Sequence, residues 1–212
     1  MKWPTVEELT MLMPLPDGYR MERFDRASIG PLVAALKEWS PHLSAGVSSG
    51  YLREDFYQTK VCLYGESDRD IFVAPIYFND ILVGMWSVER EEDSLAIYGR
   101  LIVVAPEHRG SGFAIHVSAG SENVGRSMGA EFIYALATLK SIHAQRALER
   151  AGYRLLGFFP GFDREEISPG VFKRVYQAVY AKLLVPDDHI LRPAAKNMTP
   201  RSKMIFDLLF SD

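Results

Sequence analysis

Residues 102–114 of the chain have the sequence IVVAPEHRGSGFA, and this stretch decides the fold. The apolar, β-branched run at 101–104 is typical of a buried strand, and Pro106 ends it because proline has no amide hydrogen for a strand ladder. Gly110 and Gly112 tolerate positive φ, so the backbone can turn several N–H groups toward one point. Those amides also begin a helix, whose dipole attracts a phosphate. Spacing alone leaves two interpretations open, an anion-binding loop and a simple packing turn.

The sequence before this loop predicts a run of antiparallel strands. Two apolar segments at 71–78 and 81–90 flank Asn79 and Asp80, whose side chains tolerate positive φ, so we expect a hairpin with a two-residue turn. A short acidic turn leads into the next strand at 95–104. Upstream of the hairpin we expect a strand at 18–24, a helix at 28–39 and a short helix at 51–60.

The sequence after the loop predicts a crossover followed by a second hairpin. Apolar residues recur on one helical face between 112 and 128, and a helical crossover makes the strand at 131–139 parallel to the strand at 95–104. Beyond it we expect a helix at 144–151 and strands at 153–160 and 171–185. The fold class is therefore α/β, with a mixed, mostly antiparallel sheet of about seven strands flanked by helices.

Two motifs carry a resemblance to a known family. The segment RGSGFA at 109–114 resembles the R/Q-x-x-G-x-G/A signature of the GNAT superfamily of N-acetyltransferases, and VAP at 104–106 matches its V-x-P lead-in. About thirty residues on, AQRALERAGY at 144–153 resembles the family's A-x-x-L-Y-E-K-x-G-F element. The resemblance spans roughly 18–185. It implies an N-terminal extension at 1–17, a GNAT-like domain at 18–185, and a C-terminal extension at 186–212 with a short helix after Thr199.

The resemblance implies an acetyl transfer from acetyl-CoA to an amine by direct attack. In the family the loop holds the pyrophosphate, and pantetheine inserts between two strands that splay apart. The residues that would bind acetyl-CoA here are Ile102, Val103, Val104, Arg109, Gly110, Ser111, Gly112, Phe113, Ala114 and Ser141. We expect no metal cofactor.

The chain departs from the family at Leu148, where many members have a tyrosine that protonates the coenzyme A thiolate. Three alternatives stay open: the thiolate leaves without a protein acid, another group replaces the tyrosine, or the chain binds acyl-CoA without turnover. His143 is the first replacement to consider because imidazole titrates near neutral pH. Glu89 and Tyr98, on the strands before the loop, are the candidates for a general base. A non-catalytic acyl-CoA-binding or regulatory module is the alternative function.

The acceptor is the least determined part of the site. The carboxylates in residues 161–170 could attract a cationic amine, although we favour a solvated loop for this segment. The acceptor could be a small molecule or a peptide. Ile205, Leu208, Leu209 and Phe210 leave open a contact between two copies, and thus a homodimer.

Composition limits the other classes of function. The chain has 212 residues, 48% of them hydrophobic, which suits one sizeable domain. A net charge of −3 without a basic stripe argues against nucleic acid as a partner. No stretch is long enough to span a membrane, and no apolar segment follows the N-terminal lysine as in a secretory signal. The single cysteine, Cys62, excludes an intrachain disulfide, so we expect a cytoplasmic protein.

Overall fold

The computed structural model describes residues 1–210, and a mixed sheet forms its centre. Within these residues the sheet has eight strands in the order β1-β3-β4-β5-β6-β8-β7, with β2 beside β3. The strands are β1 (Tyr19–Met21), β2 (Val61–Cys62), β3 (Ile71–Phe78), β4 (Ile81–Glu91), β5 (Ala96–Val104), β6 (Phe132–Thr138), β7 (Arg154–Ser168) and β8 (Val171–Leu183). Among these strands only the β2–β3 and β5–β6 pairs are parallel. The predicted fold class is confirmed, and the two-residue β2 accounts for the strand beyond the expected seven.

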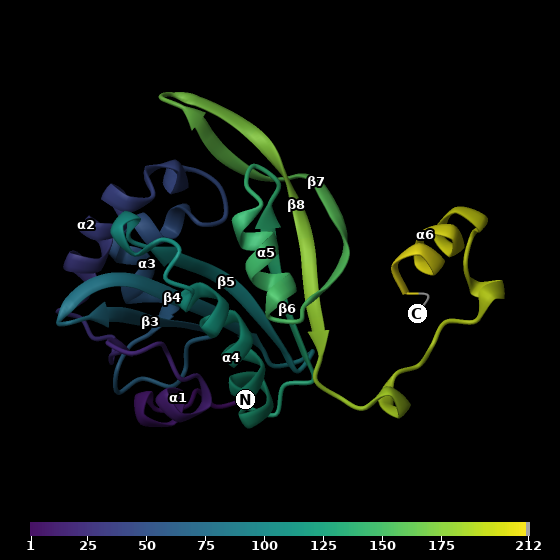
Figure 1. Ribbon diagram of the computed structural model, residues 1–212, viewed down its shortest axis with the longest axis horizontal. Coiled ribbons are helices and arrows are strands. Elements are labelled where there is room, and N and C mark those ends of the chain that lie inside the picture. Colours follow the sequence, from purple (N-terminus) through teal and green to yellow (C-terminus); the bar gives the residue numbers. More distant parts are fainter. Residues whose placement is uncertain (211–212) are drawn as a thin grey trace.

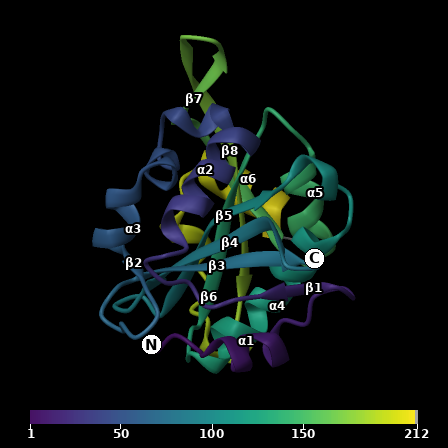
Figure 2. The same ribbon diagram turned by 90° about the vertical axis from the view of Figure 1, so that its left-hand side faces the viewer.

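Helices cover both faces of the sheet. The α-helices are α1 (Val6–Leu12), α2 (Ile29–Trp39), α3 (Glu54–Lys60), α4 (Phe113–Ser127), α5 (His143–Arg150) and α6 (Pro200–Phe210). Short 3₁₀ turns are η1 (Pro41–Ser44), η2 (Ser49–Leu52), η3 (Pro106–His108), η4 (Asp187–His189) and η5 (Ala195–Asn197). Helices α2 and α3 lie on one side of the central strands and α4 and α5 on the other (Figure 2). No helix within residues 1–210 is both long and apolar enough to cross a membrane.

Two apolar clusters hold these layers together. The α4 face buries Phe113, Val117 and Val124 with Trp86 and Ile97 of the sheet, so the predicted helical periodicity is confirmed. The opposite cluster joins α2 and α3 to the other face of β3, β4 and β5. Burial of large aliphatic and aromatic side chains stabilises each layer by about 1.5–3 kcal/mol per side chain. The sheet therefore has one apolar core on each face. The loops leave the ends of its strands.

The hairpin between β3 and β4 forms at the predicted turn. Asn79 and Asp80 have φ of 47° and 68°, the left-handed pair that a two-residue type I′ turn requires. Phe78 and Ile81 face each other across the turn, and pairing continues to Ile71 and Glu89. The register that this turn sets places Ser87 and Glu89 on the face that α2 and α3 partly cover.

Strands β5 and β6 pair along only part of their length. Their ladder runs from Ala96 and Phe132 to Gly99 and Ala135, and there it ends. Each strand continues, because residues 100–104 still pair with β4 and residues 136–138 still pair with β8. The facing edges of β5 and β6 therefore part toward their carboxyl ends, as the family resemblance implies.

The short helix expected at 51–60 is present as α3 but begins only at Glu54, because Arg53 is extended and separates it from η2. One expectation about local structure was wrong. The segment at 161–170 is not a loop, since β7 continues to Ser168 and turns sharply into β8. Its side chains alternate, so Asp163 and Glu165 are buried against η1 rather than solvated. This packing against a distant segment of the chain favours a strand that local composition did not indicate.

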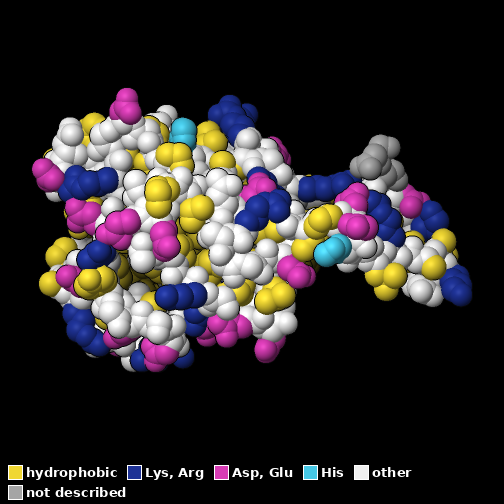
Figure 3. All heavy atoms as spheres, turned by 90° about the horizontal axis from the view of Figure 1, so that it is seen from below, with side chains coloured by type: hydrophobic (Ala, Val, Ile, Leu, Met, Phe, Trp, Pro, Cys, Tyr) yellow, Lys and Arg dark blue, Asp and Glu magenta, His cyan; other side chains and the backbone are white. Residues whose placement is uncertain are grey.

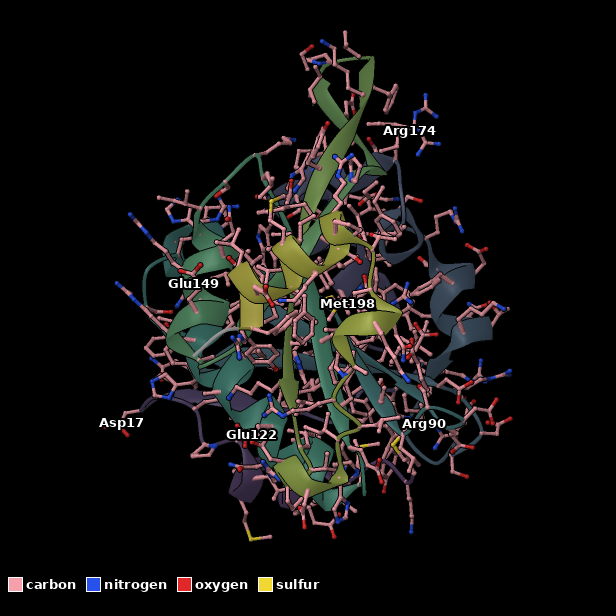
Figure 4. All side chains as sticks on the ribbon, turned by 90° about the vertical axis from the view of Figure 1, so that its right-hand side faces the viewer. Asp17, Arg90, Glu122, Glu149, Arg174 and Met198 are labelled. Atoms are coloured by element: carbon pink, nitrogen blue, oxygen red, sulfur yellow. The ribbon has the colours of Figure 1, made fainter. Side chains whose placement is uncertain are left out.

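The C-terminal helix α6 stands apart from the two cores. Figure 1 shows an extended arm that leaves β8 and carries η4, η5 and α6 away from the sheet, and Figure 3 shows the same part projecting from the body. The predicted cap is present, because Thr199 Oγ1 accepts a hydrogen bond of 3.2 Å from the amide of Ser202. Seen from the side of the arm, α6 and Met198 lie in front of the sheet (Figure 4). A cavity of about 530 Å³, lined in part by Phe132, Leu183 and Phe210, separates α6 from the strands.

The contact between α1 and α4 leads to a stability prediction. A Cβ added at Gly120 of α4 would lie 2.9 Å from the Cα atom of Met13. The Met13 side chain is fully buried and packs against α4 at this point. We expect Gly120→Ala to push α1 away and to lower the free energy of unfolding by about 1–3 kcal/mol. Gly30→Ala is the matched control in α2, because its Cβ would have 3.8 Å of room. Urea unfolding of both variants tests this, and equal stability of the two would contradict it.

Candidate functional site

The loop between β5 and α4 presents a set of unpaired amides. Gly110 and Gly112 both have φ of 87°, and open space lies where a Cβ of either would be. Ser111 donates its amide to His108 in a local turn. Among the described residues, the amides of Gly110, Gly112, Phe113 and Ala114 have no acceptor. Four free N–H groups at the start of a fifteen-residue helix fit an anion such as a phosphate.

Packing of Phe113 fixes this loop on the sheet. Its ring is fully buried and lies 5.5 Å from the Tyr19 ring. Gly84 of β4 makes room for it, since a Cβ there would lie 2.7 Å from Phe113 Cζ and 2.6 Å from the carbonyl oxygen of Val103. Tyr19 also pairs through its hydroxyl with His108 Nδ1 at 2.8 Å. The first turn of α4 is thus held in place before any ligand arrives.

Arg109 lies at the edge of the loop and is bound to the protein itself. Its Nη2 donates to the carbonyl of Trp39 at 3.1 Å, and its Nε donates to the carbonyl of Val104 at 3.4 Å. These bonds join the end of α2 to the end of β5. The side chain is exposed.

The other residues predicted to bind acetyl-CoA lie along the parting strands. Val103 is buried under α2, whereas Ile102 and Val104 are half-buried on the α4 side. All three lie on the stretch of β5 whose edge toward β6 is unpaired. Ser141 is placed after β6, where its hydroxyl accepts the amide of His143 at 3.2 Å. The loop and the opening are therefore adjacent, at the carboxyl end of β5.

A hydrogen-bonded network lies where the β5–β6 ladder ends. Arg100 Nη1 donates to Glu89 Oε2, and Arg100 Nε donates to the Tyr51 hydroxyl at 3.1 Å. The Tyr51 hydroxyl in turn lies 2.6 Å from Ser87 Oγ. Sequence reasoning singled out Glu89 but missed its three partners, because they come from η2, β4 and β5. The only sequence signal for them was the polar pair Ser87 and Arg100, each within an apolar run of its strand.

Tyr98, the other candidate base, faces the same side as Glu89. It pairs with Glu89 across the β4–β5 ladder and stacks on Tyr134 with ring centroids 4.9 Å apart. Burial raises the pKa of Tyr98 to about 12. Its phenol is therefore protonated near neutral pH and can donate a hydrogen bond but not accept a proton. This chemistry favours Glu89 over Tyr98 as the base.

Leu148 and His143 lie on opposite parts of α5. Leu148 is 8% exposed and belongs to the core on the α4 side, so its role in the structure is packing. His143 is the first residue of the helix and is exposed. Helix α5 is fixed on β8 by Glu149, whose Oε1 accepts the Tyr180 hydroxyl at 2.8 Å; Figure 4 shows Glu149 on this helix.

Ionisable groups also gather between η1 and β7. Lys140, just after β6, forms an ion pair of 2.7 Å with the buried Glu165. Asp163 Oδ1 accepts the amides of Val47 at 2.9 Å and Arg164 at 2.7 Å. His42 is exposed at the surface, but partial desolvation by its neighbours lowers the pKa of its imidazole. The charge of Glu165 raises this pKa, and the charges of Lys140 and Arg109 lower it. Within residues 1–210 no group of three or more His, Cys, Asp or Glu is placed to hold a metal ion.

Comparisons with known proteins agree with this geometry. The model of the acetyltransferase (GNAT) family matches residues 33–153, more than half of the chain. The chain therefore belongs to the acetyltransferase (GNAT) family. The comparison with curated protein sequences gave no significant match.

Solved structures share the fold at low sequence identity. The spermidine/spermine N-acetyltransferase SpeG from Vibrio cholerae, in mutant forms, is 14% identical with a TM-score of 0.62, covering 80% of this chain and 95% of that one. A GNAT-family acetyltransferase from Bacillus anthracis is 16% identical with a TM-score of 0.59, covering 80% and 98%. The microcin C7 self-immunity acetyltransferase MccE, solved with acetyl-CoA and AMP, is 11% identical with a TM-score of 0.62, covering 79% and 93%.

The position of His42 gives a prediction about pH. Because partial desolvation lowers its pKa from the ordinary 6.5, the unfolded chain binds more protons than the folded chain just below pH 6.5. The contribution of His42 to stability is therefore complete above pH 6.5 and is lost as the pH falls below it. A proton NMR titration should give a His42 midpoint below 6.5, and His42→Gln should remove this part of the pH dependence of unfolding. A midpoint at or above 6.5 would contradict the prediction.

Proposed function

We propose that the chain transfers the acetyl group of acetyl-CoA to an amine by direct attack, without a covalent enzyme intermediate. The observation that carries the proposal is the set of four free amides at the start of α4, directly beside the parted edges of β5 and β6. The free amides of the loop can bind a pyrophosphate, and the opening between β5 and β6 can hold the narrow, extended pantetheine part of the donor. Family membership supports acetyl-CoA as the donor.

The donor would contact the ten residues named from the resemblance. The free amides of Gly110, Gly112, Phe113 and Ala114 would bind phosphate oxygens. The unpaired edge of β5 at 102–104 would bind the amides of pantetheine. Arg109 would exchange its bond to the Trp39 carbonyl for a phosphate, which is the stronger acceptor because it is charged. Ser141 would approach the pantetheine part of acetyl-CoA from the β6 side.

Glu89 is the group that we propose to receive the proton. The amine nitrogen attacks the thioester carbonyl, a C–N bond forms, the C–S bond breaks, and the amine proton passes to a carboxylate directly or through water. Glu89 Oε2 is occupied by Arg100, whereas Oε1 has no donor among the described residues. One carboxylate oxygen is thus anchored and the other is left for the acceptor. Holding both reactants in one place supplies much of the rate.

The chain lacks the tyrosine that protonates the coenzyme A thiolate in many members of the family. Buried Leu148 donates no proton, so the thiolate leaves as such or takes a proton from exposed His143 or from water. The same residue is the specific observation that favours the alternative, a non-catalytic acyl-CoA-binding module. Binding of acetyl-CoA without turnover of any amine would support that alternative.

The acceptor that we propose is a small-molecule or peptide amine in the cytoplasm. It would enter from the side of η1 and η2, where Glu89, Asp163 and Glu165 lie. SpeG is described as a spermidine/spermine N-acetyltransferase, and it is one example of an amine acceptor in this fold. We keep self-association through α6 as a proposal as well. The exposed Ile205 and Leu208 support it.

A negative charge introduced into the loop tests whether the loop binds acetyl-CoA. Ser111→Glu places a carboxylate among the free amides without a side chain at a positive φ, which a change at Gly112 would require. We expect the variant to bind acetyl-CoA at least about tenfold more weakly, because like charges placed together in a binding site cost several kcal/mol. Isothermal calorimetry with acetyl-CoA and coenzyme A measures the effect.

Ser111→Gln is the matched control, since glutamine has the size of glutamate without its charge. We expect it to bind within about threefold of the wild type, a difference of at most about 0.7 kcal/mol. Equal weakening by both variants would show that bulk rather than charge matters. No binding by the folded wild type would refute the proposed donor.

A further inference from the structure

In the network around Arg100, the donor and the acceptor of each hydrogen bond can be assigned in only one way. Ser87 Oγ lies 2.9 Å from the Phe72 carbonyl oxygen, and a carbonyl only accepts, so the Ser87 hydroxyl donates there. Ser87 must then accept from the Tyr51 hydroxyl at 2.6 Å. The hydrogen of Tyr51 is therefore used, and its oxygen accepts from Arg100 Nε, which cannot accept anything. The relay runs from Arg100 through Tyr51 and Ser87 to the backbone of β3.

This relay holds a side chain that would otherwise be mobile. Arg100 is anchored at Nε by Tyr51 and at Nη1 by Glu89, and its guanidinium lies 5.6 Å from the Tyr98 ring centroid. Fixing an arginine in one rotamer is otherwise opposed by the entropy of its long side chain. Its side chain is only 17% exposed, so water screens its ion pair with Glu89 less than it would at the surface. Tyr51 is fully buried and cannot move away.

The relay ends where the two strands part. Gly99 pairs with Val88 and Leu101 pairs with Ser87, which leaves Arg100 as the extra residue of a β-bulge. Gly99 is also the last residue of β5 that pairs with β6. The anchored arginine, and with it the Glu89 carboxylate, therefore lies at the inner end of the opening. Within the opening, this is the end farthest from the amides of the loop.

We propose that Tyr51 is a positioning residue for the acetyl transfer: acting through Arg100, it fixes the Glu89 carboxylate at the inner end of the opening. This inference rests on the proposed function, because it needs Glu89 to receive the proton of the acceptor amine. The hydroxyl of Tyr51 itself touches no reacting atom. Its effect is to define where Glu89 Oε1 lies.

Tyr57 offers a matched control in the same core. Its side chain is as fully buried as that of Tyr51, and the two rings are 6.1 Å apart. The Tyr57 hydroxyl donates to the backbone carbonyl of Tyr51 at 2.9 Å and is not part of the relay. Tyr57→Phe therefore removes one buried hydrogen bond of the same core without releasing Arg100.

The experiment compares the wild type, Tyr51→Phe and Tyr57→Phe with acetyl-CoA and an amine that the wild type acetylates. We expect both variants to lower Tm by similar amounts and to bind acetyl-CoA with unchanged affinity. Only Tyr51→Phe should lower kcat, by roughly tenfold to a hundredfold, which is the scale of a small misplacement of a reacting group. In a Glu89→Gln background, Tyr51→Phe should lower kcat no further, because both changes act on the same step.

Equal kcat for the two phenylalanine variants would overturn the proposal, as would a full further loss in the Glu89→Gln background. A wild type that turns over no amine would refute the proposed function instead. The positioning would then be judged on the NMR signal of the Arg100 Nε–H group. Slow exchange with water in the wild type and Tyr57→Phe, but fast exchange in Tyr51→Phe, would uphold it. The same exchange rate in all three proteins would overturn it.

Discussion

The end of the β5–β6 ladder is the constraint on which the rest of the site depends. Two parallel strands joined by a helical crossover would ordinarily pair along their whole length, and here they pair only to Gly99 and Ala135. Each strand keeps its other partner, so the outer ladders hold the two halves of the sheet in place. Backbone groups that face each other across the opening are left for a ligand. An unpaired edge inside a sheet is costly, and a bound chain of amides is one way to satisfy it.

Features around the opening act together. Phe113 secures the first turn of α4, so the free amides of the loop keep a constant distance from the carboxyl end of β5. Arg100 anchors the inner end to β4 and η2. Between these two points residues 102–104 form a partly buried edge. The ends of the site are therefore rigid, which favours preorganised binding over binding that must order the protein.

Local sequence was sufficient for most of the elements but not for the far half of β7 or for the network. The hairpin at Asn79 and Asp80 and the loop at Gly110 and Gly112 were predicted, because a positive φ leaves a clear mark on residue choice. The relay was not predicted, since Tyr51 lies 36 residues from Ser87 and 49 from Arg100 in the chain. The far half of β7 was missed for the same reason. Its glycines, proline and charges are typical of a loop, and only contact with η1 shows why Asp163 and Glu165 face inward.

The length of the arm that joins α6 to β8 determines how often α6 lies against the sheet. Within the described residues α6 buries no side chain fully, and its links to the sheet include the bonds from Arg154 to the Leu209 carbonyl. A weak attachment of this kind is maintained by the local concentration that the connecting arm creates, not by intrinsic affinity. Lengthening the arm would dilute α6 near its docking place, at a cost that grows only with the logarithm of the length. The arm at residues 184–199 thus sets the occupancy of the docked state without making any of its contacts.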